Sequence, residues 1–555
     1  MLRPIKSRNP QIPPSTKFIP SEVEGLGIPF GRTSPVIRDV FLCLLSAFLL
    51  VASFPKLNLE FLAWFGFVPL FLAIENKSRK RVFLFSYLAG IVFWLGIIHW
   101  LVHVTAAGMI LLVLYLALYF GIFGLIFSAV RCRLYTIHLL FIPSAWVILE
   151  YMRSYFLTGF PWTLLGHSQY LNLGVIQIAD LGGAWCVSFL VVLINVGIYS
   201  AIRKRPKNLL ISLLCLVVAL GYGYYKIYEG RKTLLRQGFV GQVKDPTSPR
   251  LRRAGEGRIK VSIIQPNIPQ QLKWSEPSRD FIRTRLLELT QDAVRQNPDL
   301  IIWPESAIPD YLETQMGTDL KKGLAQIKDD NLGYLFSLAK KIKTPILLGL
   351  VSVEGNNYFN SAILVSQEGS IVKRYDKIHL VPFGEYIPLR KALPFLETVV
   401  PIGDFTAGKH YTVFPYPVKS SVLICFEDIF PEISRRFAQK GADLLINVTN
   451  DAWFSDTSAP YQHLASSIFR AVENRLPLVR SANTGISCFI DSSGKIFSWI
   501  NDHEGKPTFV SGIKTEEVLL NKRYSFYLRF GDIFVFICFL FFGYTILFSL
   551  EAGKK

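Results

Sequence analysis

Long apolar stretches fill the first part of the chain and return near its end, with a more mixed block between them. A helix needs about 20 mostly apolar residues to cross a bilayer, and eight stretches approach that length. They lie near residues 38–55, 58–74, 82–102, 107–130, 134–155, 174–201, 209–227 and 526–549. The pattern therefore predicts a polytopic α-helical membrane bundle of about eight spans.

In the block between the seventh and eighth spans, short apolar runs alternate with amphipathic stretches. The apolar runs indicate buried strands, which we place at 260–267, 299–305, 344–350, 361–366, 422–428, 442–451 and 487–491. The amphipathic stretches predict helices at 279–295, 331–342, 431–440 and 459–474. Strands that alternate with helices around a largely buried sheet are typical of an α/β domain.

The same patterns divide the chain into five predicted segments. The start of the chain is rich in Pro, Ser and Gly and shows no periodicity, which predicts a disordered tail. The stretch 237–257 is polar and basic, which predicts an insert within a linker. The segments are a cytoplasmic tail 1–37, a seven-span membrane domain 38–227, a linker 228–257, an α/β domain 258–515, and the eighth span with the C-terminus 516–555.

The composition and net charge raise the question of whether the chain binds nucleic acid. The chain is 51% hydrophobic and carries a net charge of +19, which could indicate nucleic acid. Many basic residues instead flank the spans, as in 79–81 and 203–207, while the loops 103–107 and 156–173 contain no Lys or Arg. Because basic loops stay in the cytoplasm, we predict cytoplasmic termini, a periplasmic α/β domain, and no nucleic-acid partner.

The cysteines point to chemistry rather than to disulfides or metal binding. Five of the seven lie in or beside apolar spans, and only Cys425 and Cys488 fall in the α/β block. The sequence contains no CxxC or HExxH motif and no Cys/His cluster, so we predict no metal and no cofactor.

Three polar residues occur at or just after strand-like runs beside turns marked by Pro or Gly. They are Glu305 in "LIIWPESAIP", Lys377 in "RYDKIHLVPFGEYIP" and Cys425 in "VLICFEDIFPE". A carboxylate can take the thiol proton, the thiolate can attack an acyl carbon, and an ammonium can stabilise the resulting oxyanion. Each residue alone has an ordinary structural explanation, but their co-occurrence indicates acyl transfer through a cysteine.

The motifs "WPES", "YDKIHLVPFGEY" and "CFEDIFPE", in this order, resemble the carbon–nitrogen hydrolase (nitrilase) superfamily over about 258–515. With the predicted spans, the whole chain resembles the apolipoprotein N-acyltransferase family. The segments "PNIPQQLKW", "NDAWF", "RSANTG" and "LTGFPWTLLGHSQY" agree with that resemblance. It implies a nitrilase-like, four-layer αββα sandwich attached to the membrane bundle.

The resemblance also implies roles for individual residues. Glu305 matches the general base, Lys377 the oxyanion-stabilising lysine, Cys425 the nucleophile, and Glu385 a second acid that holds the triad. Positions with a supporting or substrate-binding role are Trp274, Asn360, Phe426, Glu427 and Trp453. Phe426 departs from the pattern, because many relatives have Tyr there.

The function implied by the resemblance is transfer of a fatty acyl chain from a phospholipid to an apolipoprotein, the last step of lipoprotein maturation. The acceptor would be the α-amino group of an N-terminal diacylglyceryl-cysteine, and the enzyme a monomer in the bacterial inner membrane. One alternative is a membrane-anchored amidase of the same superfamily that acts on a periplasmic amide. Another is a transporter or scaffold with an inactive domain. Intact Glu305, Lys377 and Cys425 and the lack of internal repeats argue against the latter.

Overall fold

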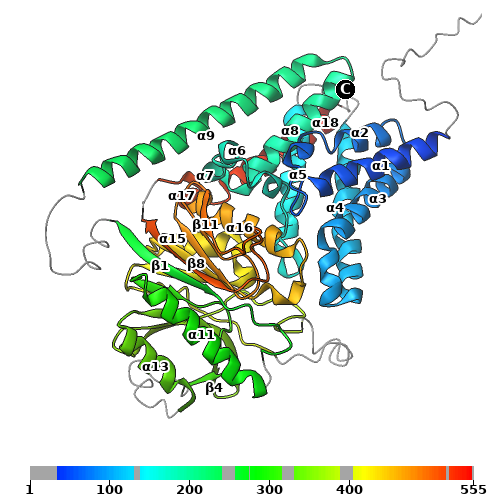
Figure 1. The fold of residues 1–555 in the computed structure, drawn as a ribbon. Coiled ribbons are helices and arrows are strands. Elements are labelled where there is room, and N and C mark those ends of the chain that lie inside the picture. The colour runs from blue at the N-terminus through cyan, green and yellow to red at the C-terminus, as the bar shows by residue number, and fades with distance from the viewer. Residues whose placement is uncertain are drawn as a thin grey trace, which may run out of the picture.

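The computed structural model describes residues 34–130, 138–240, 257–273, 276–314, 330–387, 404–520 and 524–552. Of the predicted tail 1–37, only the last four residues are described, and helix α1 (Pro35–Ala52) already begins there. Most of the insert 237–257 lies outside the described residues. Its first four residues belong to helix α9, which continues well beyond the predicted span 209–227. Figure 1 shows α9 running past the α/β part of the molecule.

Five helices in the described part of the chain are long and apolar enough to cross a membrane. Each contains at least 18 residues with few charges, as a membrane span requires. They are α1, α3 (Arg79–Ile98) with the short turn after it, α4 (Ala106–Val130), α8 (Ala184–Ile202) and α9 (Pro206–Val240). The helical part is therefore that of a multi-pass membrane protein.

The predicted count of eight spans is not confirmed, because the predicted spans 58–74, 134–155 and 526–549 give none of these five helices. Within 134–155 lies helix α5 (His138–Tyr155), which contains Pro143 and Arg153. Three predicted spans are interrupted, including 174–201, which still contributes α8. The span at 58–74 divides into a short 3-10 turn and helix α2 (Val68–Ile74). The span at 174–201 is broken before α8 at Gly183, where φ is +71°. The span at 526–549 divides into α17 (Phe526–Phe530) and α18 (Ile533–Ala552) at Gly531, where φ is +61°. Hydropathy does not reveal the break at Gly183, whereas Arg529 and Asp532 beside Gly531 interrupt the last apolar run.

The α/β part contains two sheets, and the first has seven strands. Its order is β12 (Gly512–Leu519), β1 (Arg258–Gln265), β2 (Leu300–Ile302), β4 (Ile346–Glu354), β5 (Asn357–Val365) and β6 (Ile371–Asp376), with β3 (Tyr311–Thr314) also paired to β4. The second has the order β11 (Ile496–Trp499), β10 (Cys488–Ile490), β9 (Leu478–Ala482), β8 (Leu444–Thr449) and β7 (Ser420–Ile424).

Helices cover the outer faces of both sheets, which confirms the predicted αββα sandwich. Helices α11 (Arg279–Val294) and α13 (Asp330–Ile342) pack on the first sheet. Helices α15 (Pro431–Gln439) and α16 (Ala459–Asn474) cover the second sheet on the side that faces α7 (Ala179–Gly182) and α17 (Figure 1). Strands β1, β2 and β4 are parallel, as are β7, β8 and β9, so their carboxyl ends gather at one edge of each sheet.

The predicted helices agree closely with the observed ones, whereas the strands agree less well. The predicted helix 459–474 coincides with α16, which has Pro460 in its first turn, and Arg475 ends it in the left-handed conformation. Strands β3, β6, β9, β11 and β12 were not predicted. The predicted strand 422–428 ends at Ile424, because a 3-10 turn, η7 (Cys425–Ile429), begins at the next residue.

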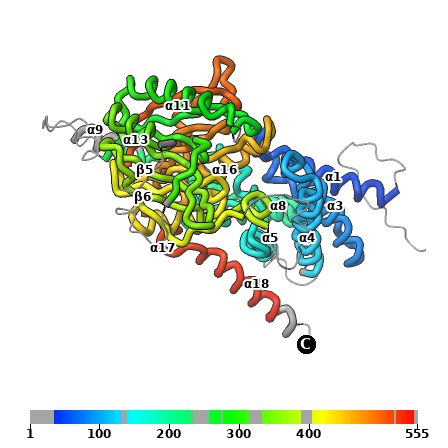
Figure 2. Tube along the Cα trace, turned by 90° about the horizontal axis from the view of Figure 1, so that it is seen from below, coloured from blue at the N-terminus to red at the C-terminus, as the bar shows by residue number. Residues whose placement is uncertain are grey.

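One hydrophobic core runs through the membrane helices, the inner side of α16, the second sheet and the space between the sheets. A smaller core lies between the first sheet and its own helices. Buried polar contacts reinforce the junction with the bundle: Arg475 pairs with Asp180 at 2.6 Å, and Glu473 accepts a hydrogen bond from the Ala184 amide at 2.9 Å. Figure 2 shows the α/β part beside the bundle from a second direction.

Candidate active site

Cys425 lies on a sharp turn between β7 and η7. Its φ of +50° is in the left-handed region, which residues other than glycine seldom occupy. Such strain is typical of functional positions whose surroundings hold the backbone in place. Here Asn447 Nδ2 donates to the Cys425 carbonyl oxygen at 3.2 Å, and His463 Nε2 lies 3.2 Å from the same oxygen.

Glu427 fastens this turn to the segment that carries Lys377. Its Oε1 accepts hydrogen bonds from the Tyr375 hydroxyl at 2.7 Å and from the backbone amides of Ile378 at 2.7 Å and His379 at 3.2 Å. Its Oε2 accepts a hydrogen bond from the Ile424 amide at 2.8 Å. Burial raises the pKa of Glu427 to about 7, although these donors favour the charged form. Glu427, two residues after Cys425, therefore fixes the neighbouring backbone through hydrogen bonds and does not face the thiol.

Asp428 belongs to a buried charge network behind the turn, which the sequence analysis missed. His463 Nε2 lies 2.7 Å from Asp428 Oδ1, and its Nδ1 lies 3.0 Å from Asp451 Oδ1. Arg480 pairs with both aspartates, at 3.1 and 3.0 Å. The signal in the sequence is that Asp428 and Asp451 end runs predicted to be buried strands, 422–428 and 442–451, whereas Arg480 lies in β9, which was not predicted.

The network shifts the pKa values of its members in opposite directions. Burial alone would raise the pKa of Asp451, but Arg480 and His463 lower it to about 2. Burial and Arg480 would lower the pKa of His463, but Asp428 and Asp451 outweigh them and raise it to about 9. The histidine is therefore protonated at neutral pH, and two carboxylates balance two cations beneath Cys425.

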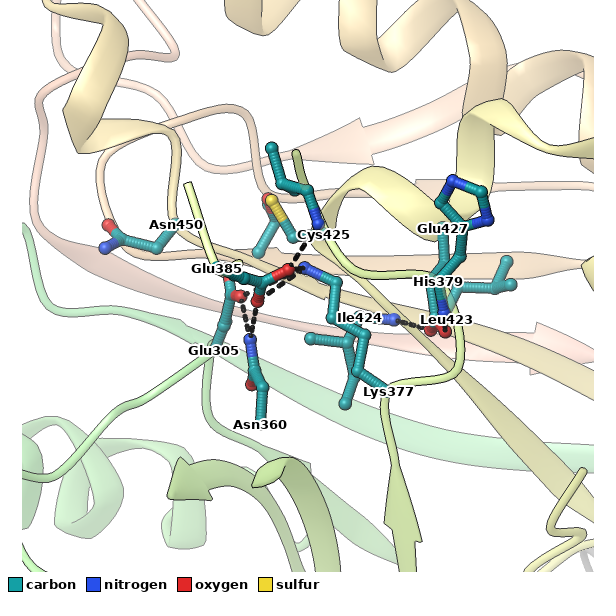
Figure 3. A network of polar contacts seen from close by, with 12 residues as sticks. Glu305, Asn360, Lys377, His379, Glu385, Leu423, Ile424, Cys425, Glu427 and Asn450 are labelled. Carbon is teal, nitrogen blue, oxygen red and sulfur yellow. Dashed lines mark hydrogen bonds and ion pairs between the residues drawn. The ribbon is translucent and has the colours of Figure 1, made fainter. Parts of the chain in front are cut away.

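Lys377 lies among acids in front of the thiol, as Figure 3 shows. Its Nζ donates to Glu385 Oε1 at 2.9 Å and lies 3.9 Å from Glu305 Oε1. Asn360 Nδ2 donates to both carboxylates, at 2.8 Å each, and so joins them. Gly349 in β4 allows this arrangement, because a side chain there would place Cβ 2.6 Å from the Glu305 Cα.

The electrostatics keep the thiol protonated until a base acts. Burial and Glu305 raise the pKa of Cys425, while Lys377 opposes them. Burial alone would lower the pKa of Lys377, but Glu385 and Glu305 outweigh it and raise that pKa. A permanently charged ammonium beside a neutral thiol and a carboxylate can support base-assisted attack on a carbonyl and stabilise the oxyanion that forms.

The structure brings together Glu305, Asn360, Lys377, Glu385 and Cys425. The other predicted positions differ in their surroundings. Phe426 is half-buried, and its ring stacks on that of Trp162, 6.3 Å between centroids. Trp453 is 51% exposed, and no described hydrogen bond joins it to these five residues. Trp274 lies outside the described residues.

Gln462 on α16 joins the α/β part to residues of the membrane bundle. Its Oε1 accepts hydrogen bonds from the indole nitrogens of Trp100 at 3.0 Å and Trp162 at 2.8 Å. Its Nε2 donates to the Ile97 carbonyl at 3.0 Å. Because Trp162 stacks on Phe426, the residue after Cys425, the bundle and the nucleophile turn are connected by direct contacts.

A cysteine on a strand–helix turn, faced by two acids and a lysine within an αββα sandwich, defines an enzyme of the carbon–nitrogen hydrolase class. The carbon–nitrogen hydrolase family model matches residues 260–517, and the model for the apolipoprotein N-acyltransferase N-terminal domain matches residues 46–197. The chain belongs to the apolipoprotein N-acyltransferase family and is a membrane acyltransferase.

Individual relatives show how far the similarity extends. The apolipoprotein N-acyltransferase of Geobacter metallireducens is 37% identical over 93% of this chain and 96% of its own length. That of Chlorobaculum tepidum is 30% identical over 90% and 94%. Among solved structures, a carbon–nitrogen hydrolase from Helicobacter pylori covers 48% of this chain and 90% of its own, with 18% identity and a TM-score of 0.36.

Proposed function

We propose that this protein transfers a fatty acyl chain from a phospholipid to the α-amino group of the N-terminal diacylglyceryl-cysteine of an apolipoprotein. The observation that carries the proposal is the cluster around Cys425, built in a domain whose core is continuous with membrane helices. Both substrates are lipids, so a site whose nucleophile turn contacts Trp162, next to the membrane bundle, is suited to both.

In the first half of the reaction, Glu305 takes the proton from the Cys425 thiol, and the thiolate attacks the ester carbonyl of the phospholipid. Lys377 stabilises the oxyanion of the tetrahedral intermediate. When the intermediate collapses, Glu305 returns the proton to the oxygen of the departing lysophospholipid. Cys425 then carries the acyl chain as a thioester.

In the second half, the lipoprotein amine attacks the thioester carbonyl and Lys377 again stabilises the oxyanion. Glu305 accepts a proton from the attacking nitrogen and passes it to the sulfur as the C–S bond breaks. The amide product leaves with the thiol restored. Glu385 holds Lys377 in position through both halves, because it accepts a hydrogen bond from the ammonium. Asn360 holds Glu305, because its amide bridges the two carboxylates.

The proposed setting is the periplasmic face of the inner membrane, with both termini in the cytoplasm and the enzyme acting as a monomer. The charge asymmetry of the loops supports this orientation. The second candidate is amide hydrolysis by the same site. Phe426 and Trp162 favour transfer over hydrolysis, because aromatic rings beside the nucleophile restrict the access of water to the thioester.

The test is to incubate the purified protein with phosphatidylethanolamine and a diacylated lipopeptide and to measure products by mass spectrometry. We expect a triacylated peptide, and none with Cys425→Ala. Release of free fatty acid at the rate of phospholipid consumption, without acylated peptide, would instead establish a hydrolase.

A further inference from the structure

A second lysine lies in the site without a part in the chemistry described above. Lys273, in the loop after β1, is only 3% exposed, and its Nζ donates to the backbone carbonyl oxygen of Glu305 at 3.0 Å. Burying an ammonium is unfavourable unless charged or polar partners compensate for the lost water. Its position beside the general base therefore calls for an explanation.

The loop that carries Lys273 is firmly held on the side of the second sheet. Asn483 donates to the Ile268 carbonyl at 2.8 Å and accepts from the Ile268 amide at 2.9 Å. Asn450 Nδ2 donates to Gln270 Oε1 at 2.9 Å. Lys273 thus extends from a loop fixed to the second sheet toward Glu305, which follows a strand of the first sheet.

The charges of the site supply the reason for a second cation. Glu305 and Glu385 are two carboxylates that share one ammonium, Lys377. Forming the thiolate leaves more negative than positive charge in the site. Two negative groups face the one ammonium when Glu305 holds the proton, and three face it when the proton leaves to solvent. Lys273 restores the balance, and both Glu305 and Cys425 interact electrostatically with it.

We propose that Lys273 is a positioning residue that holds the turn of Glu305 and supplies the positive charge needed to form the Cys425 thiolate. This role rests on the proposed functions of Glu305 and Cys425. The ammonium has three N–H groups, and one of them holds the Glu305 carbonyl. Its charge acts on the sulfur through space, without a bond to the substrate.

The ionisation of Lys273 adds a measurable consequence. Burial lowers the pKa of Lys273 to about 8, although Glu305 and Cys425 oppose the change. The residue is therefore largely protonated at pH 7 and loses its charge as the pH rises through 8. Among the described residues, Glu305, Lys377, Asp451 and Arg480 also interact electrostatically with Cys425. Support for the thiolate from Lys273 should accordingly fade above pH 8.

The experiment measures alkylation of Cys425 by iodoacetamide in the detergent-purified full-length protein from pH 6 to 9.5, by peptide mass spectrometry. Lys273→Gln removes the charge but keeps an N–H donor, and Lys273→Arg keeps the charge. Lys506→Gln is the matched control, because Lys506 pairs with Asp456 on the exposed surface. At pH 7 we expect roughly tenfold slower alkylation in Lys273→Gln, equivalent to one pKa unit, near-normal rates in Lys273→Arg, and no change in the control.

Two results would overturn the proposal. One is wild-type alkylation of Lys273→Gln at every pH, and the other is equal slowing in the Gln and Arg variants, which would show that charge is irrelevant. If neither variant folds, the wild-type profile decides, since a rate that keeps rising steeply through pH 8 contradicts the role. The assay needs no lipid, so failure of the acyltransferase proposal would be seen separately with the lipopeptide.

Discussion

Replacing Gln462 by Leu should uncouple the catalytic domain from the membrane helices. The two side chains are similar in size, so the change removes hydrogen bonds without leaving a large cavity. It leaves the indole N–H groups of Trp100 and Trp162 without their acceptor in a buried place. An unsatisfied buried donor costs about 1–3 kcal/mol, so two of them predict a loss of about 2–6 kcal/mol of stability.

Thermal unfolding of the purified protein in detergent measures this loss. For a domain of this size, about 2 kcal/mol corresponds to a fall in melting temperature of roughly 4 °C or more. Lipopeptide acylation should fall as well, because Trp162 loses the bond that holds its ring against Phe426.

The matched control is Gln439→Leu, the same substitution at the same junction. Gln439 is exposed, and within the described part of the chain its side chain makes one hydrogen bond, to the Leu528 carbonyl at 3.1 Å. Its loss should change stability by no more than about 0.5 kcal/mol. Equal melting temperatures for the Gln462 and Gln439 variants would refute the view that Gln462 holds the two parts together.

Three further predictions concern the site itself. Lys377→Arg should lower acylation at least a hundredfold, because a planar guanidinium cannot replace a compact ammonium between two carboxylates; near-normal turnover would remove Lys377 from the site. Phospholipid alone should add one hydroxylamine-sensitive acyl group to Cys425 and none to Cys488, which is fully buried. A gain in intact mass that persists in Cys425→Ala would contradict Cys425 as the acylated residue. The raised pKa of His463 predicts that its charge stabilises the fold fully below about pH 6.5 and that this stabilisation is lost as the pH rises through about 9. The melting temperatures of wild type and His463→Gln should therefore converge above about pH 9. A difference that stays constant with pH would contradict this prediction.

The sequence was sufficient to predict the parts of the fold that depend on local patterns. Helix α16 has a strong apolar periodicity and a proline in its first turn, and its predicted bounds coincide with the observed ones. Glu305 and Cys425 could be selected because each follows an apolar run, where the ends of strands meet. Lys377 follows β6, which was not predicted, and it was selected from its turn motif and its co-occurrence with the other two.

Features that depend on distant partners could not be predicted in this way. Arg480 appears in the sequence as an isolated charge within an apolar strand, and only the fold reveals its two aspartate partners. Lys273 lies in a polar loop, and nothing nearby in the sequence indicates that it contacts Glu305. The break at Gly183 depends on backbone conformation, to which hydropathy is insensitive.

The hydrogen bonds between Arg435 of α15 and the backbone of α17 bear on the order in which the parts of the protein are synthesised and assembled. Arg435 donates from its Nε to the carbonyl oxygens of Tyr527 at 3.1 Å and Leu528 at 3.0 Å, and from Nη2 to that of Arg529 at 3.1 Å. These carbonyls are synthesised after the whole sandwich. When translation has passed β12, the catalytic domain is therefore complete with its triad but still lacks the contact between Arg435 and α17. The bonds from Arg435 can form only after residues 527–529 have been translated, later than the contacts that Arg475 and Glu473 make with earlier helices.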